Sequence, residues 1–417
     1  MKALIYEDEK WMDLTPLTYL RPVFELKCGA TNLLEKILPK IHGMETGLWI
    51  RDYLAPLIQK KYRQPVNKKD FWTEDIVLVN GRWLAKPADN LTLEEEAIFT
   101  SEGDIVYAVI RKETINKFWD GDLYSFLAEI QKSLPAISIQ AKIINYPWNL
   151  VHYNSEMLEI DFNNKSKKGI EGKVSSSTVV YGPEDRLYVA GETEIHPFVV
   201  LDTNDGSIFI DRKVKIFPYT RIKGPCYIGE ATDIMPGANI REGNSFGPCC
   251  RIGGEVEESI FHGYSNKYHD GFIGHAYVCE WVNLGALTTN SDLKNDYSTV
   301  SVYVNDSLVD TGDLKVGSFI GDHTKTSIGV LLNTGTVTGI MCNITAGGIL
   351  PKFFPSFIWF INGKYMKGFG IETMLETARR AMARRNTELL QEEENIIRYI
   401  YEQTQSLRNK YIKKTQR

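Results

Sequence analysis

Residues able to carry acid–base chemistry are concentrated in one polar segment of the sequence. It contains Ser265-Asn266-Lys267-Tyr268-His269-Asp270, then Gly274-His275, then Asn283-Leu284-Gly285-Ala286. A neutral imidazole such as that of His269 can take a proton from an ammonium or hydroxyl nucleophile near pH 7. Backbone N–H groups near Gly285 and Ala286 could stabilise the oxyanion that forms when this nucleophile attacks a thioester.

A second candidate site lies near the N-terminus. The run Arg21-Pro22-Val23-Phe24-Glu25-Leu26-Lys27-Cys28-Gly29 places two cations near a glycine turn. Such a segment could bind phosphate groups, or it could simply connect a strand to a helix. The spacing alone supports both interpretations equally.

The element that would position the polar segment is indicated by a six-residue period. An apolar residue recurs at Ile210, Ile216, Ile222, Ile228, Ile234, Ile240, Phe246 and Ile252, and shorter runs include Phe272, Val278, Leu284 and residues 320–350. A period of six fits neither a helix nor simple strand alternation. It is typical of a β-helix, in which each aliphatic side chain packs on the coil below. Breaks in phase at 202–207, 254–266 and 290–317 predict excursions from the coil.

A zinc site is the alternative role for the histidines. His262, His269 and His275 resemble the histidines of β-helical, zinc-dependent carbonic anhydrases. A spacing of six would place His269 and His275 on neighbouring faces of one coil, so they could converge only with another subunit's help. We therefore rank zinc below acid–base chemistry.

The two ends of the chain differ from the repeat region. Residues 1–165 alternate short β-rich segments with helical segments, which predicts an α/β domain with a parallel sheet. We place the β-helix at 178–350. Residues 351–417 should form an apolar loop, which includes 353–361, and one long helix over about 372–410, a stretch without Pro or Gly.

Composition excludes several classes of protein. Of 417 residues, 43% are hydrophobic and 24% are charged, and the net charge of −5 argues against a nucleic-acid partner. The start of the chain lacks the apolar stretch of a secretory signal, and the most apolar late run is too short to span a bilayer. Six cysteines without a CxxC pair indicate free thiols. We expect a cytoplasmic protein without a membrane span.

These features together resemble a known enzyme family. An α/β domain joined to a left-handed hexapeptide β-helix is similar to bifunctional UDP-N-acetylglucosamine diphosphorylase/glucosamine-1-phosphate N-acetyltransferase, and most similar to a divergent bacterial sugar nucleotidyltransferase branch. The resemblance covers nearly the whole chain. Its most telling segments are LTYLRPVFELKCG (17–29), YPWNLV (146–151), 265–297, GDHTKTSIGVLLNTGTVTG (321–339) and PKFFPSFIW (351–359).

The resemblance implies residue roles in the acetyltransferase half. The family's base stands fourteen residues before an Asn-Ile-Gly-Ala segment, as His269 stands before Asn283. Ala286 falls where the family contacts the acyl thioester, and Phe272 replaces a Tyr that contacts the sugar. Asp292 falls in the substrate-positioning segment in either possible alignment. A phosphate-binding Arg is replaced by Met235, so that phosphate binding would rest on Lys267 or Arg241.

The nucleotidyltransferase half departs further from the family. Its Gly-rich loop is absent, which leaves Arg21 and Lys27 as candidates for triphosphate contact. The magnesium-binding Asp appears as Arg82, although Asn80 could still offer an oxygen and Asp161 could supply a carboxylate.

The resemblance implies an enzyme that uses acetyl-CoA, a nucleoside triphosphate, a sugar phosphate and Mg²⁺, and that assembles as a homotrimer. Two alternatives remain open. The chain could be a single-activity nucleotidyltransferase with a structural β-helix, or a non-catalytic sugar-nucleotide-binding protein.

Overall fold

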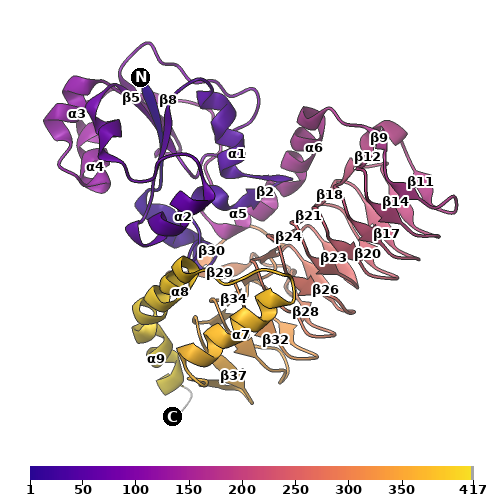
Figure 1. The fold of residues 1–417 in the computed structure, drawn as a ribbon. Coiled ribbons are helices and arrows are strands. Elements are labelled where there is room, and N and C mark those ends of the chain that lie inside the picture. Colours follow the sequence, from indigo (N-terminus) through magenta and orange to yellow (C-terminus); the bar gives the residue numbers. More distant parts are fainter. Residues whose placement is uncertain (415–417) are drawn as a thin grey trace. The chain divides into compact units, whose positions relative to one another are not determined.

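The computed structural model describes residues 1–414, which pack into two units (Figure 1). The first unit comprises Met1–Leu14, Leu20–Leu26 and Thr31–Tyr146. The second comprises Thr15–Tyr19, Lys27–Ala30 and the chain from Pro147 onward. The N-terminal part of the sequence thus contributes to both units, while the boundaries 1–165, 178–350 and 351–417 stay a prediction.

The first unit is built on a mixed sheet rather than the parallel sheet that we predicted. The strand order is β4-β1-β5-β7-β6-β8. The bounds are β1 Lys2–Tyr6, β4 Thr46–Trp49, β5 Ile76–Asn80, β6 Ala97–Ser101, β7 Asp104–Ile110 and β8 Ala136–Ser138. Strands β4, β1 and β5 are parallel, whereas β7 is antiparallel to both β5 and β6. The short turn between β6 and β7 forces this antiparallel pairing, and both Glu102 and Gly103 have positive φ there.

Short helices accompany this sheet. They are α1 Leu33–Ile37, α2 Ala55–Lys61, α3 Lys112–Phe118 and α4 Leu123–Ser133, with 3-10 helices η1 Glu9–Leu14, η2 Val23–Glu25, η3 Leu38–Ile41, η4 Asp52–Leu54 and η5 Lys69–Thr73. A capping box between Asn32 and Glu35 begins α1. The α4 residues Phe126 and Ile130 pack with Leu4 and Leu78 in the core of this unit.

The second unit contains the predicted β-helix. Its strands join in parallel into sheets along the coils, and the stack extends through β37. One sheet contains β9 Gly169–Ile170, β12 Leu187–Val189, β15 Ile208–Ile210, β18 Cys226–Ile228, β21 Asn244–Phe246, β24 Ile260–Phe261, β27 Tyr277–Val278, β31 Phe319–Ile320, β34 Val337–Thr338 and β36 Phe353–Phe354.

The other sheets complete each coil. On the second face lie β10 Lys173–Val174, β13 Glu194–Ile195, β16 Lys215–Ile216, β19 Asp233–Ile234, β22 Arg251–Ile252 and β25 Asn266–Lys267, and in a separate sheet β32 Lys325–Thr326, β35 Asn343–Ile344, β37 Trp359–Ile361 and β38 Lys364–Met366. On the third face lie β11 Val179–Tyr181, β14 Val200–Asp202, β17 Arg221–Lys223, β20 Asn239–Ile240, β23 Glu255–Glu257 and β26 Phe272–Gly274, with β28 Thr289–Asn290 pairing with β33 Leu331–Leu332.

The hexad prediction is confirmed for its longest run. All eight residues from Ile210 to Ile252 are fully buried in one hydrophobic cluster. Phe272 departs from the prediction because the inward residue of its strand is Ile273, which pairs with Val256. The predicted excursion at 254–266 is also wrong, since it contains β23 and β24.

The long excursion at 290–317 is confirmed. It carries an antiparallel hairpin of β29 Ser301–Val304 and β30 Ser307–Asp310. The apolar segment 353–361 is not a loop, because β36 and β37 continue the stack.

Helices of the second unit lie before and after the coils. They are α5 Pro147–His152, α6 Asn154–Lys165, α7 Ile371–Ala383, α8 Gln391–Gln403 and α9 Gln405–Lys414, with the 3-10 helix η6 Glu184–Arg186. The single C-terminal helix that we predicted is therefore divided. Asn386 adopts a left-handed conformation after α7, which ends the first segment.

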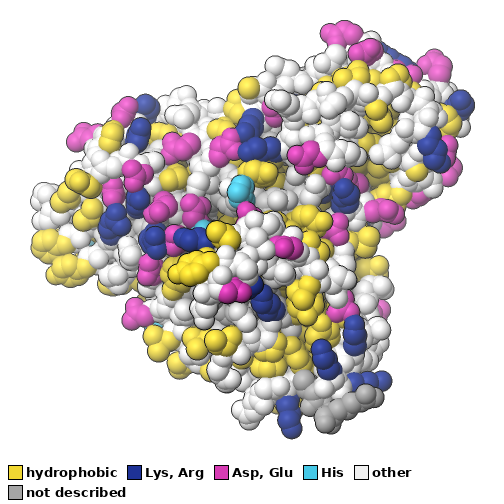
Figure 2. Space-filling model, turned by 180° about the vertical axis from the view of Figure 1, so that it is seen from behind, with side chains coloured by type: hydrophobic (Ala, Val, Ile, Leu, Met, Phe, Trp, Pro, Cys, Tyr) yellow, Lys and Arg dark blue, Asp and Glu magenta, His cyan; other side chains and the backbone are white. Residues whose placement is uncertain are grey.

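Surface and thiol chemistry agree with the composition. Over most of the face in Figure 2, acidic and basic side chains lie next to one another. All six cysteines lie in the described residues and are free thiols, as predicted. Within residues 1–414, no helix is long and apolar enough to cross a bilayer.

Candidate functional site

The corner that follows β25 carries His269. Its side chain is exposed, and its ring centroid lies 5.0 Å from that of Tyr268. The next coil stacks directly on this corner, because the Leu287 N–H donates to the Asp270 carbonyl at 2.8 Å. His269 and Ala286 therefore lie on the same ridge in adjacent coils, as an imidazole base and an oxyanion donor would need to.

The two amides proposed for the oxyanion differ in their surroundings. The Gly285 N–H donates to Thr326 Oγ1 at 2.9 Å. The Ala286 carbonyl accepts from Gly329 N–H at 2.8 Å, but its own N–H has no hydrogen-bond partner within the described chain. The oxyanion role would therefore rest on Ala286.

Lys267 lies inside the coil, where it follows Ile252 in register. Its side chain is 2% exposed, and Nζ donates to the carbonyls of Gly253 at 2.7 Å and His269 at 3.0 Å. Burial lowers the pKa of Lys267 to about 8, although the charges of Asp270 and Glu255 oppose this shift. The amine thus holds the corner of His269 and does not reach the outer surface.

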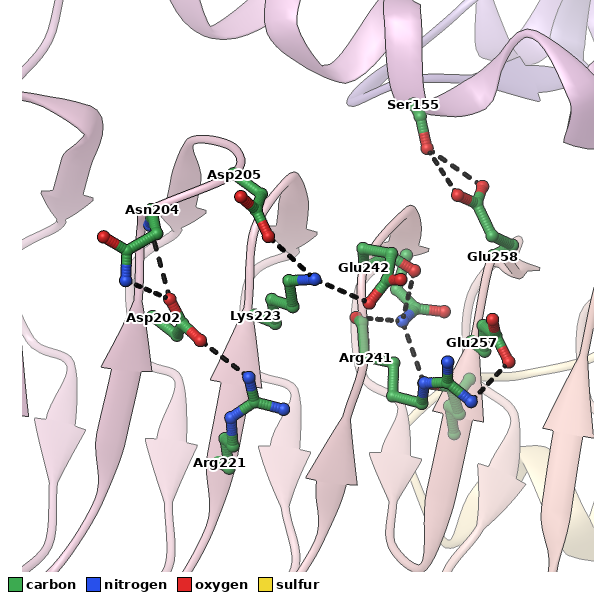
Figure 3. Close-up of polar contacts among 12 residues, drawn as sticks. Ser155, Asp202, Asn204, Asp205, Arg221, Lys223, Arg241, Glu242, Glu257 and Glu258 are labelled. Atoms are coloured by element: carbon green, nitrogen blue, oxygen red, sulfur yellow. Dashed lines mark hydrogen bonds and ion pairs between the residues drawn. The ribbon is translucent and has the colours of Figure 1, made fainter. Parts of the chain in front are cut away.

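A ladder of ion pairs runs along the face that contains β14, β17, β20 and β23 (Figure 3). Arg221 pairs with Asp202 at 2.6 Å and Lys223 with Asp205 at 2.9 Å. Arg241, the other phosphate candidate, pairs with Glu257 at 2.8 Å. Phosphate binding by Arg241 would therefore have to compete with this carboxylate.

A histidine–carboxylate pair ends this face. His275 Nδ1 lies 2.8 Å from Asp292 Oδ2, and the two side chains are only 17% and 13% exposed. Burial alone would raise the pKa of Asp292, but the hydrogen bond and charge of His275 lower it below its ordinary value. A carboxylate on Nδ1 fixes the imidazole tautomer and leaves Nε2 for proton transfer.

Phe272 and Gly274 shape the surroundings of this pair. A Cβ on Gly274 would lie 2.4 Å from the Phe272 ring and 2.6 Å from Asp292 Oδ2, so glycine permits both to approach. Burial raises the pKa of neighbouring Glu258, which accepts a hydrogen bond from the Ser155 hydroxyl of α6 at 2.9 Å (Figure 3).

Our sequence analysis named His275 and Asp292 but did not pair them. The two residues are 17 apart, one fewer than the 18 that separate Ile210 from Ile228 in a regular coil, so a count of three hexads from His275 misses Asp292.

Asn283 belongs to a side-chain ladder on the β25 face. Its Oδ1 accepts from Asn266 Nδ2 at 3.2 Å, and Asn266 Oδ1 accepts from Arg385 at 2.8 Å. This ladder ties the residues after α7 to the coils of the polar segment.

In the first unit, the predicted residues Asn80 and Arg82 lie at the carboxyl end of β5. This is the edge where α/β sheets bind ligands. Arg82 is fully buried, and it contacts Asp8, which follows β1, and Asp104, which begins β7. Asp8 and Asp104 were absent from our sequence analysis, although Asp8 stands where a polar residue follows a buried strand.

The remaining N-terminal candidates are dispersed. Arg21 is buried in the first unit, where its carbonyl accepts from Arg51 at 2.9 Å. Lys27 belongs to the second unit, and its N–H donates to the Tyr277 hydroxyl at 3.0 Å. Asp161 of α6 is in the second unit as well, and its Oδ2 accepts from Ala30 N–H at 2.8 Å.

A magnesium ion does not fit the first unit's carboxylates as they stand. Arg82 is bound to both Asp8 and Asp104, and Lys10 lies 2.6 Å from Asp104. Across residues 1–414, no three His, Cys, Asp or Glu side chains form a group that could hold a metal. No step of the chemistry below passes through a metal.

Comparisons with known proteins agree with this architecture. Residues 3–169 match the protein-family model described as sugar nucleotidyl transferase. The chain thus joins a domain that is similar to sugar nucleotidyl transferases to a β-helix. It is a distant relative of proteins that are described as bifunctional, one of which is named for both nucleotidylyl transfer and acetyl transfer.

A bifunctional sugar-1-phosphate nucleotidylyltransferase/acetyltransferase of Sulfurisphaera tokodaii is 32% identical over 184 residues, which span 37% of this chain and 45% of the relative. The bifunctional protein GlmU of Prochlorococcus marinus is 22% identical over 82% of this chain and 81% of its own length. A solved Francisella novicida UDP-N-acetylglucosamine acyltransferase has 15% identity over 59% of this chain and 90% of its own, with a TM-score of 0.21.

Proposed function

We propose that the β-helix transfers an acetyl group from acetyl-CoA to an amino-sugar 1-phosphate. The observation that carries this proposal is the shared ridge of His269 and Ala286 in adjacent coils. The name of the Sulfurisphaera tokodaii relative, which pairs nucleotidylyl transfer with acetyl transfer, supports the choice of acyl group.

In the proposed reaction, the acceptor nitrogen forms a bond to the acetyl carbonyl carbon to give a tetrahedral oxyanion, and the thioester C–S bond then breaks. His269 takes the proton from the attacking amine and returns it to the departing CoA thiolate. The Ala286 N–H would donate to the oxyanion between these steps. Phe272, Asn283 and Asp292 would contact the acceptor.

The first unit is proposed to bind a nucleoside triphosphate and a sugar 1-phosphate, with Asn80 at the carboxyl end of β5 and Arg21 of the same unit as candidate contacts. Lys27 lies in the second unit and is not part of this proposal. For this unit the proposal is ligand binding. Nucleotidyl transfer stays a prediction of the resemblance, because the family uses Mg²⁺ for it and Arg82 stands at the metal position, paired with Asp8 and Asp104. A homotrimer is proposed on the resemblance alone, and a cytoplasmic location on the composition and the free thiols.

The decisive measurement is release of CoA thiol from acetyl-CoA with glucosamine 1-phosphate, using wild type, His269→Ala and His275→Ala. We expect His269→Ala to lower turnover by about two orders of magnitude, because general-base catalysis contributes that much. His275→Ala tests the other candidate base, which is paired with Asp292. If His275→Ala loses turnover while His269→Ala keeps it, the base belongs to the His275–Asp292 pair instead.

Unphosphorylated glucosamine should be assayed in parallel, because Arg241 is already paired with Glu257. Pyrophosphate release from UTP without acetyl transfer would favour the single-activity nucleotidyltransferase. Binding of sugar nucleotides without turnover in either assay would favour the non-catalytic binding protein.

A further inference from the structure

The guanidinium of Arg82 lies between two carboxylates at the carboxyl end of β5. Its Nε donates to Asp8 Oδ1 at 2.8 Å, and Nη2 donates to Asp8 Oδ2 at 2.5 Å and to Asp104 Oδ1 at 3.1 Å. Nη1 donates to the Ile144 carbonyl at 3.1 Å and to the Asn145 side chain. The side chain is fully buried, so the positive charge is fixed in this position.

Asn80 completes the set from the same strand end. Its Nδ2 donates to Asp8 Oδ2 at 2.9 Å, and its Oδ1 accepts from the Arg82 N–H at 2.9 Å. The carboxylates of Asp8 and Asp104 therefore converge on Arg82 from the ends of adjacent strands, with the Asn80 amide nitrogen bound to Asp8. Carboxylate oxygens are the donor type that Mg²⁺ and Mn²⁺ bind.

Charge balance at this edge is already complete without a metal. Burial alone would raise the pKa of Asp104, but Lys10 and Arg82 lower it below its ordinary value. Burial would likewise lower the pKa of Arg82, but its contacts with Asp8 and Asp104 raise it. Removing one member of such a buried group leaves an uncompensated charge.

We propose that the guanidinium of Arg82 takes the place of a divalent cation between Asp8 and Asp104, so that the first unit binds its ligand without a metal at this edge. A guanidinium presents a rigid planar fork and has no exchangeable coordination position. It cannot bridge phosphate oxygens as Mg²⁺ does in nucleotidyl and phosphoryl transfer. This edge is therefore a metal-independent binding site, and it does not support metal-dependent nucleotidyl transfer.

The test uses Mn²⁺ as the probe and isothermal titration calorimetry on the full chain. Wild type and Asp8→Asn should bind Mn²⁺ equally, because Asp8 is not a metal ligand. Arg82→Ala should gain one Mn²⁺ site at least tenfold tighter than any in wild type. The double variant Arg82→Ala/Asp8→Asn should lack this site. Arg111→Ala is the matched control, since Arg111 pairs with Asp75 at 3.2 Å elsewhere in the same unit.

Two results would overturn the proposal. One is a Mn²⁺ site in wild type that Asp8→Asn or Asp104→Asn weakens tenfold. The other is an Arg82→Ala protein that is folded by circular dichroism yet gains no site. If Arg82→Ala does not fold, the comparison of wild type with Asp8→Asn decides alone. None of these outcomes depends on acetyl transfer, so they are independent of that assay.

Discussion

Lys267 is a cation at a position where the two preceding coils carry isoleucine. Ile234 pairs with Ile252, and Ile252 pairs with Lys267, so the three side chains follow one another along the inside of the solenoid. The amine is held by the backbone carbonyls of Gly253 and His269. The lysine lacks the apolar contacts that an isoleucine makes here, but its two hydrogen bonds fix the corner next to the candidate site.

The lowered pKa of Lys267 predicts a pH-dependent stability. The folded protein releases this proton above pH 8, whereas the unfolded chain keeps it to about pH 10.4. The unfolded state binds more protons between these values, so stability should rise with pH across that window. Between pH 8 and pH 10, wild type should gain on the order of 2 kcal/mol in unfolding free energy relative to Lys267→Met.

Urea unfolding at both pH values measures this difference. Replacing the exposed Lys213 by Met is the control and should leave the pH dependence as in wild type. Parallel pH profiles for wild type and Lys267→Met would contradict the prediction.

At the scale of elements, Gly29 shows how a turn is fitted to α6. Its φ is +80°, and a Cβ there would lie 2.5 Å from Asp161 Oδ2 and 2.9 Å from the Met157 backbone. The Gly29 N–H donates to Asn154 Oδ1 at 2.7 Å, and its carbonyl accepts from Ser245 Oγ at 2.6 Å. Asp161 thus has a structural role, since it accepts from Ala30 in the same turn.

Gly29→Ala should destabilise the second unit more than Gly237→Ala. Both positions have positive φ, but no heavy atom of the described chain lies within 4 Å of a Cβ at Gly237. Left-handed strain of about 1–2 kcal/mol is common to both, and the clash at Gly29 should add about 1–3 kcal/mol. Equal unfolding free energies in urea would show that α6 moves aside.

The sequence predicts elements well where one repeat continues unchanged. Hexads predict the inward residues from Ile210 to Ile252, because each coil there packs its aliphatic side chain on the previous one. The coil that follows is shorter, so the count loses phase and selects Phe272 in place of Ile273. The His275–Asp292 contact depends on that coil length, and therefore spacing alone did not pair the two residues.

The buried guanidinium of Arg82 marks another limit of sequence-based prediction. The resemblance placed Arg82 at a metal position, but its partners Asp8 and Asp104 are distant in sequence and meet only through the strand order. The prediction of a parallel sheet in the first unit was wrong for a related reason. Alternation of helices and strands does not distinguish a crossover from the hairpin of β6 and β7.

At the scale of the whole molecule, the chain contains separate hydrophobic cores. Leu78 lies in the core of the first unit and Ile228 in that of the β-helix, and both are fully buried. Two calorimetric unfolding transitions are therefore expected. Leu78→Ala and Ile228→Ala should each cost about 2–5 kcal/mol and lower a different transition. A shift of both transitions by either variant would show that the units unfold together.

The division of the N-terminal residues between the units has a consequence for synthesis on the ribosome. Lys27 bonds to Tyr277 across 250 residues of sequence, and Gly29 bonds to Ser245 across 216. At about 5–20 residues per second, the ribosome needs roughly 12–50 s to make the chain between Lys27 and its partner. Residues 15–19 and 27–30 leave the ribosome long before the coils that they pack with, so the second unit can close only after most of the chain has been translated.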